Sequence, residues 1–193
     1  MWPWEHLAFG YLLYSVAVHA VDGRPPRGTP VVVLAVATQV PDLVDKSLAW
    51  VVPVFDVGYA AAHSVLVVGP LLAGVAVVAA RRGPRARRLT GAYAVGHLSH
   101  LAGDLIYSLL QGKGLGLGRI LWPVATLEPT ATRVGVVDRV TAYFLRYLGQ
   151  LRHLDPDPLL LVQVGLVLGV LALWVVDGHP GPGALWRSVA GRP

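Results

Sequence analysis

The chain contains no cysteine, only 14% of its 193 residues are charged, and Lys46 and Lys113 are its two lysines. The absence of cysteine excludes disulfides and thiolate metal sites, so any metal must be bound by imidazole and carboxylate groups. The low charge excludes an ordinary soluble domain, in which about a quarter of the residues are charged. Because cations are scarce, buried carboxylates have few ordinary partners.

Hydrophobic residues make up 54% of the chain, and the mean hydropathy is +0.57. Spans of about 20 residues with their loops use up a chain of this length. We therefore expect an all-α fold: a single multi-pass membrane bundle of five spans at residues 1–176, in contact with membrane lipid, and a flexible tail at residues 177–193. The oligomeric state is left open. The net charge of +5 does not predict nucleic-acid binding, because the basic residues lie in short segments between apolar stretches.

Five apolar stretches predict the spans, at residues 6–21, 30–55, 58–80, 89–111 and 159–176. The second is interrupted at residues 41–46 (PDLVDK), which predicts a broken helix. The backbone N–H and C=O groups freed at the break must then form hydrogen bonds with other parts of the protein or with water. Residues 112–157 are an interfacial segment, with an amphipathic helix predicted at residues 138–153. Gly165 and Gly169 form a GxxxG pair, which is typical of a close helix contact.

Positive charge is densest at residues 81–88 (RRGPRARR), between the third and fourth predicted spans. The positive-inside rule places this loop in the cytoplasm together with Arg24 and Arg27, and the N-terminus outside. The long basic loop after the fourth span then falls outside, but its length makes its charge less decisive.

Histidine and aspartate side chains are predicted to meet at one depth of the membrane. With a helix rise of 1.5 Å per residue, four spans bring such residues to one level: His6, Asp42, Asp45, His63, His100 and Asp104. His97, His100 and Asp104 have the spacing i, i+3, i+7, so they project from one helical face. An unpaired charge at the bilayer centre costs about 2.5–3.5 kcal/mol, so these carboxylates must be paired, hydrated or bound to a metal. A divalent metal fits the shortage of cations.

Simpler interpretations exist for most of these residues. Histidines at helix ends are typical of a membrane interface. This interpretation applies to His6, His19, His153 and His179. Asp42 and Asp45 fit a capped and broken helix, and His63 fits a hydrogen-bonded core histidine. His97 fits a partner that orients a metal ligand. His100 and Asp104 are the hardest to explain in these ways.

Other catalytic motifs are missing. The alternating glycines at residues 112–118 match neither the dinucleotide-binding fingerprint nor a P-loop. The chain has neither a G-x-S-x-G nucleophile elbow nor an H-E-x-x-H zinc motif.

The polar residues occur in short motifs whose order resembles a known family. The motifs are EH at 5–6, VPDLVD at 40–45, AHS at 62–64, GHLSHLAGD at 96–104 and LWP at 121–123. Over residues 4–123 the chain resembles the YdjM-like family of inner-membrane proteins, which are regarded as metal-dependent hydrolases. The resemblance implies a place in the inner (cytoplasmic) membrane and the conserved polar set His6, Asp42, Asp45, His63, His100 and Asp104.

More distantly, the order of ligands is similar to that of the zinc-dependent phospholipase C and P1 nuclease class, which hydrolyses phosphate esters at zinc ions. This similarity implies one zinc site built from Asp42, His63, His100 and Asp104. It also implies that His6, together with Asp104, holds a second ion.

These inferences lead to one hypothesis and two alternatives. The hypothesis is a membrane-embedded hydrolase with a divalent metal, zinc being favoured, that acts on a phosphoester of a lipid or lipid-linked substrate. Asp45 is its candidate base, and the metal ligands are His6, Asp42, His63, His100 and Asp104. The alternatives are a non-enzymatic membrane protein with a structural metal and a proton or ion carrier that uses the same cluster.

Overall fold

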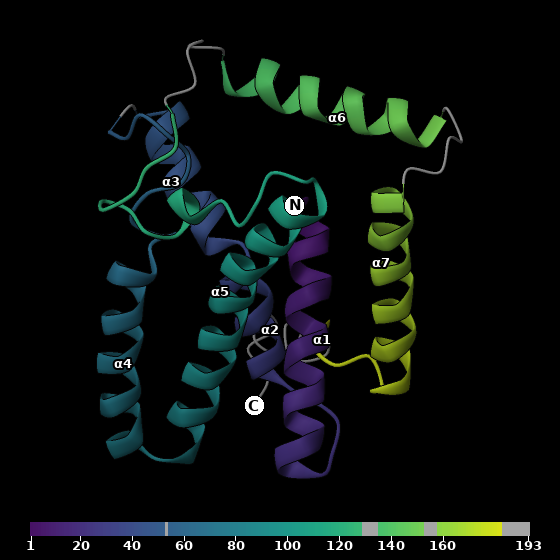
Figure 1. Ribbon diagram of the computed structural model, residues 1–193. Coiled ribbons are helices and arrows are strands. Elements are labelled where there is room, and N and C mark those ends of the chain that lie inside the picture. The colour runs from purple at the N-terminus through teal and green to yellow at the C-terminus, as the bar shows by residue number, and fades with distance from the viewer. Residues whose placement is uncertain (53, 129–134, 153–157, 183–193) are drawn as a thin grey trace.

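The computed structural model describes residues 1–52, 54–128, 135–152 and 158–182, and its elements are all helical, as the sequence predicts. The helices are α1 (Pro3–Asp22), α2 (Thr29–Ala37), α3 (Val40–Trp50), α4 (Val65–Arg82), α5 (Pro84–Leu110), the short 3-10 helix η1 (Leu117–Arg119), α6 (Val136–Arg152) and α7 (Pro158–Val176). Helices α1, α2 and α5 pack together, α4 packs on α5, and α7 packs on α1 (Figure 1). Helix α6 crosses the end of the bundle where α1 begins (Figure 1).

The break in the second predicted span lies earlier than expected. The helix ends at Ala37, Thr38 and Gln39 form a turn, and α3 continues without interruption through residues 41–46. Pro41 lies in the first turn of α3, where a missing N–H leaves no hydrogen bond unmade. The proline therefore starts a helix instead of breaking one.

The third predicted span also differs, because residues 54–64 form bends and turns and α4 begins only at Val65. His63 consequently lies in a loop, two residues before the helix.

Two described helices, α4 and α7, are long and apolar enough to cross a membrane by length and composition. The prediction of five such spans is therefore not confirmed. Helix α2 has nine residues, too few for a hydrocarbon core of about 30 Å. Helices α1 and α5 carry several buried polar residues, which lower their average hydropathy.

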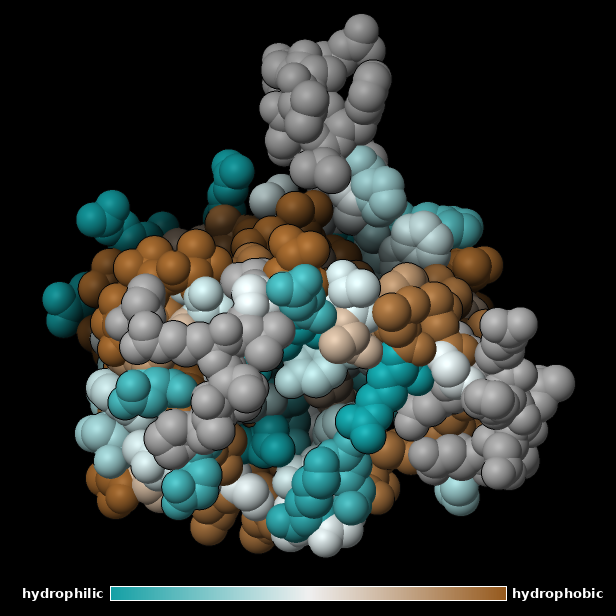
Figure 2. Space-filling model, turned by 90° about the horizontal axis from the view of Figure 1, so that it is seen from above, coloured by the Kyte–Doolittle hydropathy of each residue, from teal (hydrophilic) through white to brown (hydrophobic). Residues whose placement is uncertain are grey.

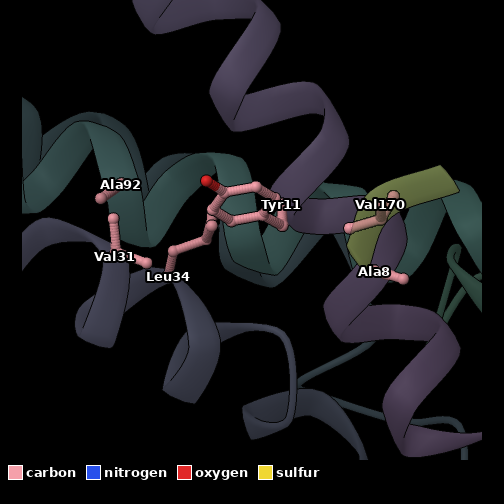
Figure 3. Packing of buried hydrophobic residues seen from close by; sticks show 6 residues of the cluster. All are labelled: Ala8, Tyr11, Val31, Leu34, Ala92 and Val170. Carbon is pink, nitrogen blue, oxygen red and sulfur yellow. The ribbon is translucent and has the colours of Figure 1, made fainter. Parts of the chain in front are cut away.

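A cluster of buried apolar side chains joins α1, α2, α5 and α7 (Figure 3). Its members are Ala8, Tyr11, Val31, Leu34, Ala92 and Val170. The Tyr11 ring lies between the α2 residues and Val170 in this view. This cluster fixes α1 against three neighbouring helices and so sets the position of His6, one turn earlier.

Two glycines allow the central helices to approach closely. A Cβ atom added to Gly96 of α5 would lie 2.7 Å from the Leu34 carbonyl oxygen, and one added to Gly10 of α1 would lie 2.5 Å from Thr38 Cγ2. By contrast, Cβ atoms at Gly165 and Gly169 would meet nothing within 4 Å in the part of the chain that the structure describes. The close contact predicted for the GxxxG pair is therefore not made among these residues.

We expect Gly96→Ala to lower the free energy of unfolding by about 1–3 kcal/mol, because its methyl group must displace backbone of α2. Gly91→Ala in the same helix is the matched control, since a Cβ there has open space and alanine favours a helix. Thermal unfolding in detergent measures both. Equal melting temperatures for the two variants would contradict the close approach of α2 and α5.

The first residue of the predicted tail is hydrogen-bonded to α1. Asp177 is buried and accepts hydrogen bonds from Tyr11 (2.6 Å), Ser15 (2.6 Å) and His19 (2.8 Å). Burial alone would raise the pKa of the Asp177 carboxyl, but these hydrogen bonds outweigh burial and hold that pKa below its usual range. The rest of the predicted tail, residues 183–193, lies outside the described residues.

Candidate metal centre

Asp45 fixes the loop that carries His63. Its carboxylate is fully buried and accepts hydrogen bonds from the backbone N–H groups of Ala60 (2.8 Å), Ala62 (3.0 Å) and His63 (2.9 Å). It also accepts one from Nδ1 of His63, at 2.8 Å. Asp45 therefore holds the loop backbone and the orientation of the imidazole at once.

His100 is oriented by the break between α2 and α3. Its Nδ1 lies 2.7 Å from the carbonyl oxygen of Thr38, the residue at which the helix stops. A carbonyl oxygen only accepts, so Nδ1 donates and the neutral ring presents the lone pair of Nε2. The bond from His63 to Asp45 has the same effect on His63.

Four side chains meet on the Nε2 side of these two rings. The Nε2 atoms of His63 and His100 lie 3.2 Å apart, and Asp42 Oδ1 lies 3.4 and 3.5 Å from them. Asp104 Oδ2 lies 3.9 Å from each. A tetrahedral zinc with bonds of about 2.0–2.1 Å separates its ligand atoms by about 3.3–3.4 Å. The distances among the His63, His100 and Asp42 atoms, 3.2–3.5 Å, are close to the edges of such a tetrahedron, whereas Asp104 lies farther out and belongs to a separate group with His6 and His100.

The two carboxylate oxygens among these four side chains lack hydrogen bonds to the residues that the structure describes. Asp42 Oδ1 and Asp104 Oδ2 are buried and accept none from the residues that the structure describes. Two imidazole lone pairs that face each other, beside two such carboxylate oxygens, repel unless a metal ion or a proton lies between them. The donor set of imidazoles and carboxylates could therefore hold a metal ion.

His6 and Asp104 form a second group with His100. The His6 ring stacks on the His100 ring at a centroid distance of 3.6 Å, and its Nε2 lies 3.4 Å from Asp104 Oδ1. Both ring nitrogens of His6 are buried without a hydrogen bond among the described residues. His6, His100 and Asp104 are close enough to hold a cation of their own, and the amino group of Met1 also lies 3.1 Å from Asp104 Oδ1.

The structure thus brings five of the six predicted residues, His6, Asp42, His63, His100 and Asp104, to one buried cluster. Asp45, the predicted base, lies behind His63, on the side of the ring away from the other ligands. Whether it acts as a base stays a prediction, but its contacts suit the positioning of His63. His97 donates from Nε2 to the Ala62 carbonyl oxygen at 2.8 Å, so it holds the same loop. His153 lies outside the described residues.

Sequence reasoning missed Tyr59 and Arg119. The Tyr59 ring packs on the edge of His63 at 4.7 Å between centroids, and the Arg119 guanidinium lies over Tyr59 at 4.8 Å from its centroid. The charges of Asp104, Arg119 and Asp42 all act on the Tyr59 hydroxyl. Both residues belong to segments outside the long helices, where no periodicity predicts which side chains meet.

The fold and the cluster define a class: a helical protein with apolar helices and a buried His and Asp centre of metal-ligand geometry. The family described as YdjM inner membrane protein matches residues 1–179 of the chain, which therefore belongs to this family and is an inner-membrane protein. This confirms the resemblance seen in its motifs. Among curated proteins and solved structures, none matches the chain.

Proposed function

We propose that this protein is a membrane-embedded, metal-dependent hydrolase that acts on a phosphoester of a lipid or lipid-linked substrate. The observation that carries the proposal is the meeting of Asp42, His63 and His100 at near-tetrahedral distances, with Asp104 Oδ2 3.9 Å from both rings. Asp42 Oδ1 and Asp104 Oδ2 accept no hydrogen bond from the described residues. Zinc bound there would polarise a phosphoryl oxygen and make a water more acidic. The chain's own residues orient these ligands, exclude bulk water and position the substrate.

The five-span arrangement is part of this proposal, with crossings at α1, at α2 with α3, and at α4, α5 and α7. Its support is the distribution of side chains on α1 and α5, which bury polar residues such as Ser15 and Ser99 and expose apolar residues such as Leu13 and Leu98. A helix that faces lipid has this pattern. The basic hairpin between α4 and α5 is then placed in the cytoplasm.

The position of the cluster supports a substrate reached from the lipid phase. His6 lies in the first turn of α1, at the end of the bundle that α6 crosses. Trp2 and Trp4 contact Phe144 and Tyr147 of α6, and such aromatic side chains favour the headgroup level. Seen from this end, hydrophilic and hydrophobic residues are interspersed, with broad hydrophobic areas toward the flanks (Figure 2). A lipid headgroup would meet the cluster at this level.

Arg119 supports an anionic substrate. Its guanidinium and the His63 ring contact the same tyrosine, Tyr59, so a positive charge lies next to the cluster. Its Nε is buried and donates no hydrogen bond to the residues that the structure describes. Arginine presents a fork of donors that matches phosphate oxygens, so a phosphoester would satisfy this group.

We expect Arg119→Gln to raise the KM for a phosphoester substrate by about 10- to 100-fold, the value of one charge-assisted hydrogen bond of about 1.5–3 kcal/mol. The bound metal should be unchanged, because Arg119 is no ligand. Steady-state kinetics and elemental analysis measure the two quantities. Lys113→Gln, an exposed cation earlier in the same loop, is the control and should leave KM unchanged. A KM that stays constant in both variants would remove Arg119 from substrate binding.

The test of the proposed function combines metal content with a substrate screen. Detergent-purified protein is analysed for bound metals and then incubated with phospholipids and lipid-linked phosphates, before and after EDTA treatment and after zinc is restored. We expect about one or two zinc ions per chain and a hydrolytic activity that EDTA removes and zinc restores.

The rival is a structural metal, which requires a closed shell of four protein ligands. Stoichiometric metal without hydrolysis of any substrate in the screen would support this rival. Protein purified without any metal would contradict both proposals and favour the proton or ion carrier.

A further inference from the structure

The other end of the bundle has a cavity that the proposed hydrolysis does not use. It lies between α1, α2 and α5 and has a volume of about 720 Å³. His6 and Val18, which lie near the two ends of α1, are twelve residues apart and hence about 18 Å along the helix. The cavity is therefore separate from the metal centre, and both loops that border it lie at the opposite end from α6 (Figure 1).

Four arginines from two segments line this cavity: Arg24 and Arg27 in the loop after α1, and Arg85 and Arg88 at the start of α5. Asp22 is the one acidic residue among the described residues that line it, and it pairs with Arg24 at 2.7 Å. Tyr14 of α1 lines the same cavity as Arg24 and Arg88, so the loop after α1 and the start of α5 face a common space. The cavity therefore has a strong positive excess.

The backbone adds to this positive charge. The first turns of α2 and α5 both border the cavity, and neither contains an acidic residue or a side-chain cap. Free N–H groups and the helix dipole make such helix starts favourable for anions. Their contribution adds to that of the arginines, which are the main source of charge.

The interior of the cavity is apolar, unlike its rim. It is lined by Val18 of α1 and by Leu89, Ala92 and Val95 of α5, which lie farther from the arginine-rich end than the arginines do. A free phosphate ion would use the rim only, whereas a phospholipid would place its phosphate among the arginines and its glycerol and first acyl carbons against the apolar wall. Arginine-lined pockets between membrane helices are suited to anionic lipid headgroups.

We propose that this cavity binds the headgroup of an anionic phospholipid of the leaflet at the arginine-rich end, and that the lipid holds α1, α2 and α5 together there. This lipid is a bound partner and not the substrate, because the metal centre lies at the far end of the same helices. The proposal is independent of the proposed hydrolysis.

The test measures lipid binding to delipidated full-length protein in detergent. The probes are phosphatidylglycerol and phosphatidylcholine with identical acyl chains, and inorganic phosphate, and binding is followed by native mass spectrometry and thermal stability. We expect phosphatidylglycerol to bind at least tenfold more tightly than phosphatidylcholine and to raise the melting temperature. Equal affinity for the two lipids would overturn the proposal, as would phosphate that binds as tightly as phosphatidylglycerol.

Two double variants separate the cavity from general surface charge. Arg27→Gln with Arg88→Gln removes one cavity arginine from the loop after α1 and one from the start of α5. We expect this double variant to weaken phosphatidylglycerol binding at least tenfold. Arg82→Gln with Arg87→Gln removes the same charge from exposed positions that do not line the cavity, and binding should be retained. Equal losses of phosphatidylglycerol affinity in the two double variants would show that the lipid responds to overall positive charge and not to the cavity. Unchanged bound metal at the far end shows that each variant is folded.

Discussion

His100→Ala and Asp104→Ala should each remove most of the bound metal. His100 belongs to both groups of the cluster, and Asp104 faces one group with Oδ2 and the other with Oδ1. Partners outside the ligand shell change metal affinity by about 10- to 100-fold, so loss of a direct ligand should exceed about 100-fold. Elemental analysis and competition with a zinc-binding dye measure the loss.

His179→Ala is the control for this prediction, because that exposed histidine lies after α7 and its ring contacts Trp174 away from the cluster. It should retain all of the metal. EDTA should lower the melting temperature of the wild type and of His179→Ala, since a metal that binds only the folded state stabilises it. The two ligand variants should no longer respond to EDTA. Metal content at the wild-type level in both ligand variants would show that the cluster is not a metal site.

The convergence of the cluster could be predicted because it depends on regular geometry. Helix rise places His6 near the start of α1 and Asp104 late in α5, and helices that run side by side bring these depths together. The spacing of His100 and Asp104 also places both on one face of α5, as the structure has them. Periodic structure can be read from residue numbers alone.

The loops could not be predicted in this way. The carbonyl of Thr38 is available to His100 because the helix breaks there and not at Pro41, and a proline signals a helix start as readily as a break. Residues 58–64 carry no charge, so the sequence predicts that His63 lies in a span, but the contacts of Asp45 hold this segment as turns. These contacts depend on tertiary structure, as does the approach of Arg119 to Tyr59.

The number of spans was also harder to read than the helical class. The long apolar helices α4 and α7 are evident from composition, whereas α1 and α5 bury polar residues such as His6, His100 and Asp104. The same residues that build the cluster thus lower the hydropathy by which a span is detected. In such helices, the more polar residues the interior holds, the lower the mean hydropathy from which a membrane span is recognised.

Asp45→Asn should weaken metal binding by about 10- to 100-fold, the usual effect of losing the partner that orients a ligating imidazole. Asparagine has almost the same shape as aspartate, but its amide NH2 is a donor. This NH2 must face at least one of the N–H groups of Ala60, Ala62 and His63 that donate hydrogen bonds to Asp45. The variant therefore loses at least one hydrogen bond and the charge that holds Nδ1 of His63 protonated. The ring is then less firmly fixed, and its Nε2 no longer points reliably at the ligand cluster.

Two roles of Asp45 predict different results. If it positions His63, the Asp45→Asn variant should recover most of its activity when zinc is in excess. If it acts as a base, metal affinity should stay normal and kcat should fall by about a hundred- to ten-thousand-fold at any zinc concentration. Asp56→Asn, an exposed carboxylate in the same loop, is the control for charge removal and should change neither quantity. We expect recovery with zinc, because all four hydrogen bonds that Asp45 accepts come from the loop of His63 and leave its oxygens turned away from the ligand cluster.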